Sequence, residues 1–153
     1  SKTQLSKGNL LVYLLDRTKE KEDFVERIAQ AKGLTPFWMN SDIDDETLPL
    51  EQRIKMPVEQ WLRSFDDAEF VLTDSFHGCV FSIIFRKQFL AVGNKKRGLE
   101  RFNSLLNLFS IKDRLISSPL SNYDNITEIN YAAIDQKLNG YRLSAMDYLK
   151  KTF

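Results

Sequence analysis

The sequence predicts a single doubly wound α/β domain, in which a parallel sheet carries helices on both faces. Three observations predict this fold. Short apolar runs alternate with segments whose apolar residues recur at helical spacing. The first run, at residues 10–15, is continuously apolar, as in a strand buried on both faces of a parallel sheet. A length of 153 residues, with 42% hydrophobic and 28% charged residues, is typical of one globular domain spanning residues 1–153.

The N-terminal half reads as strand, helix, strand, loop and helix. The strand at residues 10–15 is followed by an amphipathic helix at residues 19–32 and a short strand at residues 35–39. Residues 40–56 are polar and acidic without periodicity, which predicts a loop. Pro57 suits the first position of the next helix. This order of strands and helices establishes a βα alternation.

The C-terminal half adds two strands and three helices, at residues 70–73, 76–85, 89–92, 99–109 and about 131–151. Repeated βα units predict parallel strands with right-handed crossovers. Ligands of such sheets bind outside the carboxyl ends of the strands. Three strand-to-helix junctions therefore compete for the binding site, at residues 16–18, 74–78 and 93–98.

The junction at residues 74–78 combines a helix start with reactive side chains. Asp74 and Ser75 are good N-caps, and a helix N-terminus at the sheet edge can bind an anion. His77 is the single histidine of the chain, and imidazole is well suited to general acid or base catalysis near neutral pH. The alternative is that Asp74 or Ser75 only caps the helix and His77 packs in its first turn.

The junction at residues 93–98 has the two-glycine spacing of a P-loop, but a leucine and a glutamate follow where that motif requires lysine and serine or threonine. A basic turn remains. Lys96 and Arg97, with Arg101 one helical turn further, can bind a phosphate or a carboxylate of a substrate. The alternative is a solvated loop of charges.

Several function classes lack their sequence features. The net charge of +1 provides no overall field for nucleic acid, and the single cysteine, Cys79, excludes an intrachain disulfide and a cysteine-rich zinc site. No GxGxxG follows the first strand and no GxSxG is present, which argues against a dinucleotide site and a hydrolase elbow. Nothing in the sequence indicates a metal or another cofactor, and no apolar run reaches the ~20 residues of a membrane span.

Residues 70–85, which read FVLTDSFHGCVFSIIF, resemble the hallmark segment of the polysaccharide pyruvyltransferase family. Further matches lie on both sides of this segment and occur in the family's order. They are at Tyr13–Asp16, Lys96–Gly98, Arg101, Phe102, Leu105, Leu106, Asp113–Leu115, Arg142, Ser144, Tyr148 and Leu149. The resemblance implies a transferase of exopolysaccharide biosynthesis. Such an enzyme moves a pyruvyl group from phosphoenolpyruvate to a sugar hydroxyl pair as a ketal, in a cell-surface polysaccharide or its lipid-linked precursor.

The same resemblance implies roles for individual residues. It identifies His77 as the essential histidine, which donates a proton to generate an electrophilic pyruvyl centre. Some family members have an arginine two residues earlier, where this chain has Ser75, so other groups must neutralise the phosphate. The predicted site is catalytic His77 with the substrate-binding residues Asp74, Ser75, Gly78, Lys96, Arg97 and Arg101.

The resemblance also implies a Rossmann-like three-layer lobe, similar to the C-terminal lobe of a GT-B fold. The chain begins at Ser1 without methionine, so we expect the C-terminal part of a longer protein whose N-terminal lobe completes the cleft. The fragment alone is then expected to be inactive. We expect a cytoplasmic protein, with peripheral association at the inner membrane face through a lipid-linked acceptor. The alternatives are a GT-B glycosyltransferase that uses a nucleotide-sugar, and a non-catalytic interaction lobe in which His77 is structural.

Overall fold

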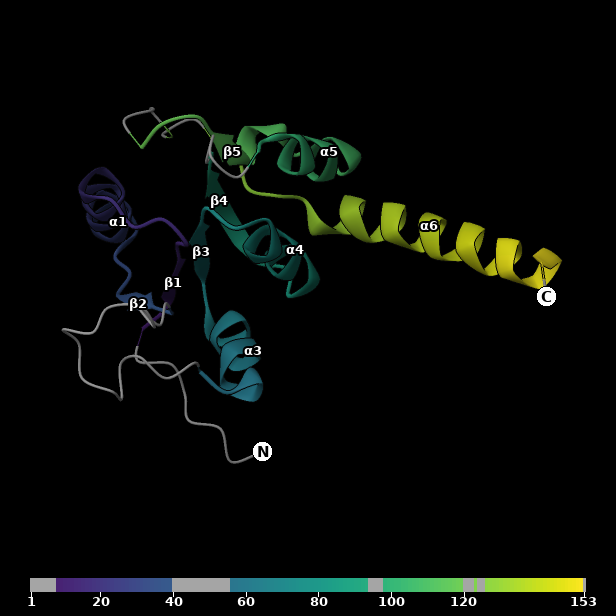
Figure 1. The fold of residues 1–153 in the computed structure, drawn as a ribbon, viewed down its shortest axis with the longest axis horizontal. Coiled ribbons are helices and arrows are strands. Elements are labelled where there is room, and N and C mark those ends of the chain that lie inside the picture. Colours follow the sequence, from purple (N-terminus) through teal and green to yellow (C-terminus); the bar gives the residue numbers. More distant parts are fainter. Residues whose placement is uncertain (1–7, 40–55, 94–97, 120–122, 124–125, 153) are drawn as a thin grey trace.

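The structure is a computed structural model that describes residues 8–39, 56–93, 98–119, 123 and 126–152. It contains a five-stranded, all-parallel sheet in the order β2-β1-β3-β4-β5. Helices flank this sheet on both faces (Figure 1). The predicted α/β fold, a Rossmann-like three-layer arrangement, is confirmed.

The strands lie close to their predicted positions, at β1 (Leu10–Tyr13), β2 (Pro36–Trp38), β3 (Phe70–Thr73), β4 (Gln88–Val92) and β5 (Leu115–Ile116). β5 is the strand that the sequence did not predict. β1 and β3 start and end at the same height in the sheet, because Leu10 pairs with Phe70 and Tyr13 pairs with Thr73. The carboxyl ends of these two strands therefore lie side by side at one edge of the sheet.

The helices are α1 (Lys19–Lys32), α3 (Val58–Asp67), α4 (Phe76–Ile84), α5 (Glu100–Leu108) and α6 (Tyr131–Thr152), with a 3₁₀ turn at Lys112–Arg114. Their bounds agree with the predicted helices to within one or two residues. Pro57 has extended ψ and stands just before α3, rather than at its first position. The predicted loop at residues 40–56 lies outside the described residues, apart from Met56.

Two apolar layers hold the helices to the sheet. α1 packs on one face through Phe24 and Ile28, against alternate strand residues such as Val12. On the other face, Leu11 and its counterparts contact α3, α4, α5 and the start of α6. Figure 1 shows α1 alone on its side of the sheet, opposite α3, α4 and α5. Because both faces are covered, the inner strands are apolar at nearly every position, with Thr73 and Gln88 as the polar exceptions, which is why residues 10–15 read as a continuous apolar run.

The strand order reverses direction between β1 and β3. The chain leaves β1 toward β2 through α1 on one face, then crosses back to β3 through α3 on the other face. From β3 it continues outward to β4 and β5. Such a switch point leaves a crevice outside the carboxyl ends of the two central strands, where ligands of these folds bind. The turn at residues 74–78 follows β3 at this point.

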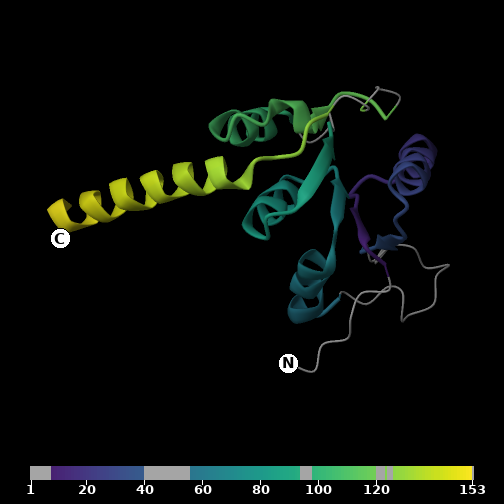
Figure 2. The same cartoon turned by 180° about the vertical axis from the view of Figure 1, so that it is seen from behind.

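The last helix packs on the body only at its start. Tyr131 and Ile134 are buried, and the single proton of the Tyr131 hydroxyl is directed at the carbonyl oxygens of Ser82 and Lys87, which both lie within hydrogen-bond distance. Every described residue beyond Leu138 is exposed, and the helix projects from the body (Figures 1 and 2). No described helix has both the length and the hydropathy of a membrane span.

Candidate functional site

Asp74 is the centre of a hydrogen-bond network at the switch point. Its side chain is fully buried, directly after β3. One carboxylate oxygen accepts from the backbone N–H of Leu15 at 2.6 Å, and the other accepts from the N–H of Asp16 at 3.1 Å. Asp74 therefore holds the loop that follows β1 against the turn that follows β3. Its predicted role in substrate binding stays a prediction.

Lys21 neutralises the charge of Asp74. Its ammonium group lies 2.7 Å from Asp74 Oδ2 and also donates to the carbonyl oxygen of Asp16 at 2.8 Å. Lys21 is buried although it belongs to the first turn of an otherwise charged helix face. Sequence reasoning missed this residue, because a lysine among charged neighbours in an amphipathic helix carries no sign of its distant partner.

A close contact between Thr73 and Gly78 shapes the turn between β3 and α4. Thr73 Oγ1 donates to the carbonyl oxygen of Tyr13 at 2.7 Å and accepts from the N–H of Ser75 at 3.0 Å. A Cβ atom on Gly78 would lie 2.2 Å from Thr73 Oγ1. Gly78 thus allows α4 to begin directly against the end of β3. The predicted contact of Gly78 with substrate stays a prediction.

Ser75 caps the N-terminus of α4. Its backbone is extended, and its hydroxyl oxygen accepts from the N–H of Gly78 at 3.4 Å. Ser75 is therefore the N-cap expected from sequence, while Asp74 has the tertiary partners described above. The substrate contact of Ser75 stays a prediction.

His77 is exposed in the first turn of α4, whereas Ser75 and Gly78 are buried and Phe76 is half-buried. Its ring packs edge-on against Phe76, with 5.9 Å between centroids. The guanidinium carbon of Arg101 lies 5.0 Å from the centre of the same Phe76 ring. The structure therefore brings an imidazole and a guanidinium, 24 residues apart in sequence, to one aromatic side chain. Lys96 and Arg97 lie outside the described residues.

Arg17 is a second cation at this edge of the sheet, and it was not among the predicted site residues. Its guanidinium carbon lies 4.1 Å from the centre of the Trp38 ring, and its Nε donates to Glu22 at 2.6 Å. The aromatic ring and the carboxylate hold the guanidinium in place while the side chain stays partly exposed. The junction at residues 16–18 was the available sequence signal for this residue.

Cys79 follows the turn but points into the core. Burial raises the pKa of the Cys79 thiol to about 12, and the nearby negative charge of Asp74 acts in the same direction. The thiolate, which is the nucleophilic form, is therefore nearly absent at neutral pH. Cys79 is a packing residue of the apolar layer under α4.

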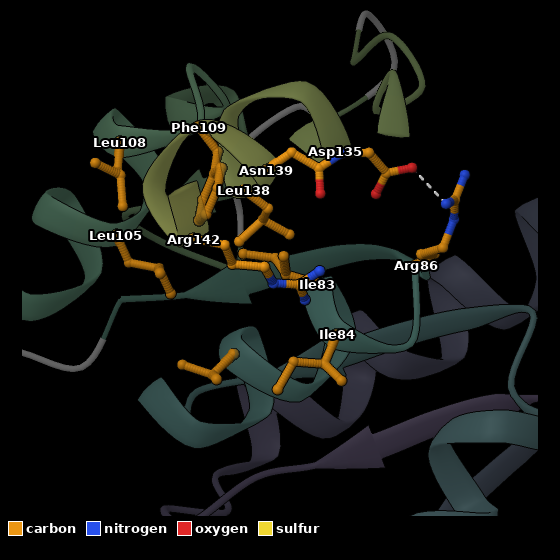
Figure 3. A pocket seen from close by; sticks show the side chains of 11 residues that line it. Ile83, Ile84, Arg86, Leu105, Leu108, Phe109, Asp135, Leu138, Asn139 and Arg142 are labelled. Carbon is orange, nitrogen blue, oxygen red and sulfur yellow. Dashed lines mark hydrogen bonds and ion pairs between the residues drawn. The ribbon is translucent and has the colours of Figure 1, made fainter. Parts of the chain in front are cut away.

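An apolar groove of about 490 Å³ lies between α4, α5 and α6 (Figure 3). Ile83 and Ile84 line it from the last turn of α4, and Leu108 lines it from the end of α5. An ion pair between Arg86 and Asp135 crosses its rim. His77 is in the first turn of α4 and does not line this groove, so the groove is separate from the candidate site.

Comparison with known proteins supports the resemblance. The model of one protein family, polysaccharide pyruvyl transferase, matches residues 10–96, which run from β1 through the turn at residues 74–78 and past β4. No curated protein and no solved structure matches the chain. The family match covers more than half of the 153 residues and includes both loops of the switch point. The chain therefore belongs to the polysaccharide pyruvyl transferase family, a family of transferases.

Proposed function

We propose that this chain binds phosphoenolpyruvate and takes part in transferring its pyruvyl group, as a ketal, to a sugar of a cell-surface polysaccharide or its precursor. The observation that carries the proposal is the position of His77. It is exposed at the carboxyl end of β3, beside the switch point, with Arg101 on the neighbouring Phe76 ring. A proton donor and a cation on the same aromatic ring suit a substrate that carries an enol carbon bonded to a phosphate.

In the proposed reaction His77 acts as a general acid. Its imidazolium gives a proton to C3 of phosphoenolpyruvate, and C2 becomes an electrophilic oxocarbenium centre. One acceptor hydroxyl forms a bond to C2, and the bond from C2 to the phosphate oxygen then breaks. The second hydroxyl closes the ketal. The two hydroxyl protons go to the imidazole and to the departing phosphate, so the histidine is ready for the next cycle.

Cations at the sheet edge would neutralise the phosphate. Two arginines lie on either side of the switch point, and each contacts an aromatic ring. Arg101 contacts Phe76, and Arg17 contacts Trp38. An arginine fixed in this way loses little side-chain freedom when it binds an oxyanion. The positive end of the α4 dipole adds a weaker attraction. Lys96 and Arg97 stay predicted contributors.

The acceptor side is also a proposal. We propose that an N-terminal lobe of a longer protein closes the cleft over His77, so that this chain alone shows little or no turnover. A cytoplasmic location, with lipid-linked acceptors at the inner membrane face, follows from the same proposal. Nothing in the proposed chemistry requires a metal or another cofactor.

The test is a titration of this chain with phosphoenolpyruvate, and separately with a uridine diphosphate sugar, followed by the NMR signals of the imidazole protons. His77 is the only histidine, so the imidazole signals can be assigned by their loss in His77→Gln alone. We expect saturable shifts with phosphoenolpyruvate alone. The shifts should weaken in Arg101→Gln and persist in Arg63→Gln, whose guanidinium binds Asp67 on α3.

Each other outcome has a definite meaning. A response only to the nucleotide-sugar would favour the glycosyltransferase alternative. Silence to both ligands would contradict a donor site on this chain and would favour the non-catalytic alternative. In that case the role of His77 would be structural, and His77→Ala would lower the free energy of unfolding.

A further inference from the structure

The ion pair between Lys21 and Asp74 connects the two loops of the switch point. Asp74 follows β3, and its carboxylate accepts the N–H groups of Leu15 and Asp16 in the loop after β1. Lys21 comes from the start of α1 and contacts both the Asp74 carboxylate and the Asp16 carbonyl oxygen. Three segments, the β1 loop, the α1 start and the β3 turn, are therefore joined at one buried carboxylate.

The Asp74 carboxylate is occupied by partners within the protein. The carboxylate has no exposed surface, and its two oxygens already accept from three donors. Removing two opposite charges from water is expensive, and an apolar pair of similar volume often gives equal stability. The pair is therefore poorly explained by stability alone, whereas its directional hydrogen bonds define how the two loops are placed.

We propose that Lys21 and Asp74 are positioning residues for the donor site at His77. They fix the loop at residues 14–18 relative to the turn at residues 74–78, and so set the distance between Arg17 on one side and His77 on the other. The inference rests on the proposed function, because it assigns the two loops to the same ligand. It places Asp74 behind the site and adds Lys21, which no sequence feature indicated.

The first test compares variants of Lys21 by their phosphoenolpyruvate dissociation constant, read from the His77 titration. Lys21→Met should weaken binding by about tenfold, since small displacements of paired binding groups are costly. Lys21→Arg keeps a donor for both Asp74 and the Asp16 carbonyl, so it should restore most of the affinity. The control is Lys19→Met, which removes an exposed lysine of the same helix turn and should leave the dissociation constant unchanged.

The double variant Lys21→Met/Asp74→Asn separates positioning from stability. Lys21→Met alone leaves a buried, unpaired carboxylate and lowers stability, whereas the double variant removes both charges and should regain most of the melting temperature. It still lacks one acceptor for the Leu15 and Asp16 N–H groups. We expect its phosphoenolpyruvate affinity to stay about tenfold weaker. Wild-type affinity in this folded variant would overturn the proposal.

A second readout does not depend on ligand binding. In the ligand-free protein, Lys21→Met/Asp74→Asn should shift the His77 ring signals and speed hydrogen exchange at the Leu15 and Asp16 amides. If the wild-type chain does not bind phosphoenolpyruvate, the proposed function fails. The His77 signals and the amide exchange rates of the ligand-free protein still test the positioning role. Unchanged His77 signals together with unchanged exchange would overturn it.

Discussion

Gly78 lies in the first turn of α4, where a side chain would collide with Thr73. Glycine within a helix normally costs roughly 0.5–1 kcal/mol relative to alanine. At Gly78 the order should reverse, so that alanine is less stable than glycine, because a Cβ atom at 2.2 Å from Thr73 Oγ1 would force the helix start away from β3. We expect Gly78→Ala to lower the free energy of unfolding by about 1–3 kcal/mol in urea denaturation.

Gly140 provides the matched control for this substitution. It also lies in a helix, α6, but nothing surrounds the position of its missing Cβ within 4 Å. Gly140→Ala should therefore leave stability unchanged or raise it slightly. Equal effects of the two substitutions would show that the contact between Gly78 and Thr73 does not constrain the turn.

Cys79 should resist alkylation in the folded protein. With burial raising the pKa of its thiol from 9.0 to about 12, the thiolate fraction near pH 8 falls by about a thousandfold. We expect iodoacetamide to react far more slowly with the native protein than with the protein unfolded in urea. Fast labelling under native conditions would mean that the α4 layer opens frequently.

The sequence predicted the residue types of the site better than their contacts. The Asp-Ser-Phe-His-Gly segment was found from its place between strand and helix, and His77 is exposed there as its proposed chemistry needs. The partner of Asp74 was not found, since Lys21 is 53 residues away and nothing local distinguishes it from Lys19. Contacts of this kind depend on the order of strands in the sheet, which local patterns do not contain.

The N-caps of α1 and α4 allow a paired test at the level of secondary structure. Thr18 accepts from the N–H of Lys21 as Ser75 accepts from that of Gly78. Thr18→Ala and Ser75→Ala should each lower the free energy of unfolding by about 1 kcal/mol. The predicted substrate contact of Ser75 is tested in Ser75→Ala, which should also weaken phosphoenolpyruvate binding in the His77 titration.

The projecting half of α6 should be dispensable for the fold. Residues 143–152 are exposed, among them Leu143 at 67% and Tyr148 at 68%. Deleting residues 143–153 should change the free energy of unfolding by less than about 0.5 kcal/mol. Ile134→Ala, in the packed first part of α6, should lower it by about 2–4 kcal/mol. A large loss of stability on this deletion would show that the projecting half of α6 contacts the rest of the domain in solution.

Helices were predicted more fully than strands. Four of the described α-helices show apolar residues at helical spacing, and α4 was predicted from an apolar run that follows the N-cap residues Asp74 and Ser75. Gly33 ends α1 in the left-handed conformation that stops a helix. β5 has two residues, which is too short for any periodicity to indicate a strand. The length of α6 was predicted from continued apolar spacing, but the same spacing gave no sign that only its start is packed.

Stability of the whole molecule should fall in alkaline solution. Burial raises the pKa of Cys79 from 9.0 to about 12 and also raises the pKa of the Tyr131 hydroxyl. Because the folded state holds these protons more tightly than the unfolded state, they contribute stability that is fully present below pH 9 and is lost as pH rises toward 12. Urea midpoints should drop over this window, and the drop should be smaller in Cys79→Ala.

The layered architecture followed from the sequence, whereas the strand order did not. Alternating strands and helices indicate a parallel sheet covered on both faces, but they fit more than one order of strands. The order β2-β1-β3-β4-β5 depends on the crossing from β2 to β3, which passes through residues 40–55 without any local signal of direction. Two of the three junctions considered from sequence, at residues 16–18 and 74–78, therefore met at one switch point only in the structure.

The two outer strands of the sheet are its shortest in the part of the chain that the structure describes. β2 has three residues and β5 has two, and β2 begins with Pro36, which has no N–H to donate. An outer strand offers unpaired backbone groups to any extended chain that meets it, and strand addition at such edges is a common route to aggregation. Edges this short give an incoming strand few hydrogen bonds. The sheet is thereby protected at both ends against growth by a foreign strand, a property that matters most when the chain is concentrated.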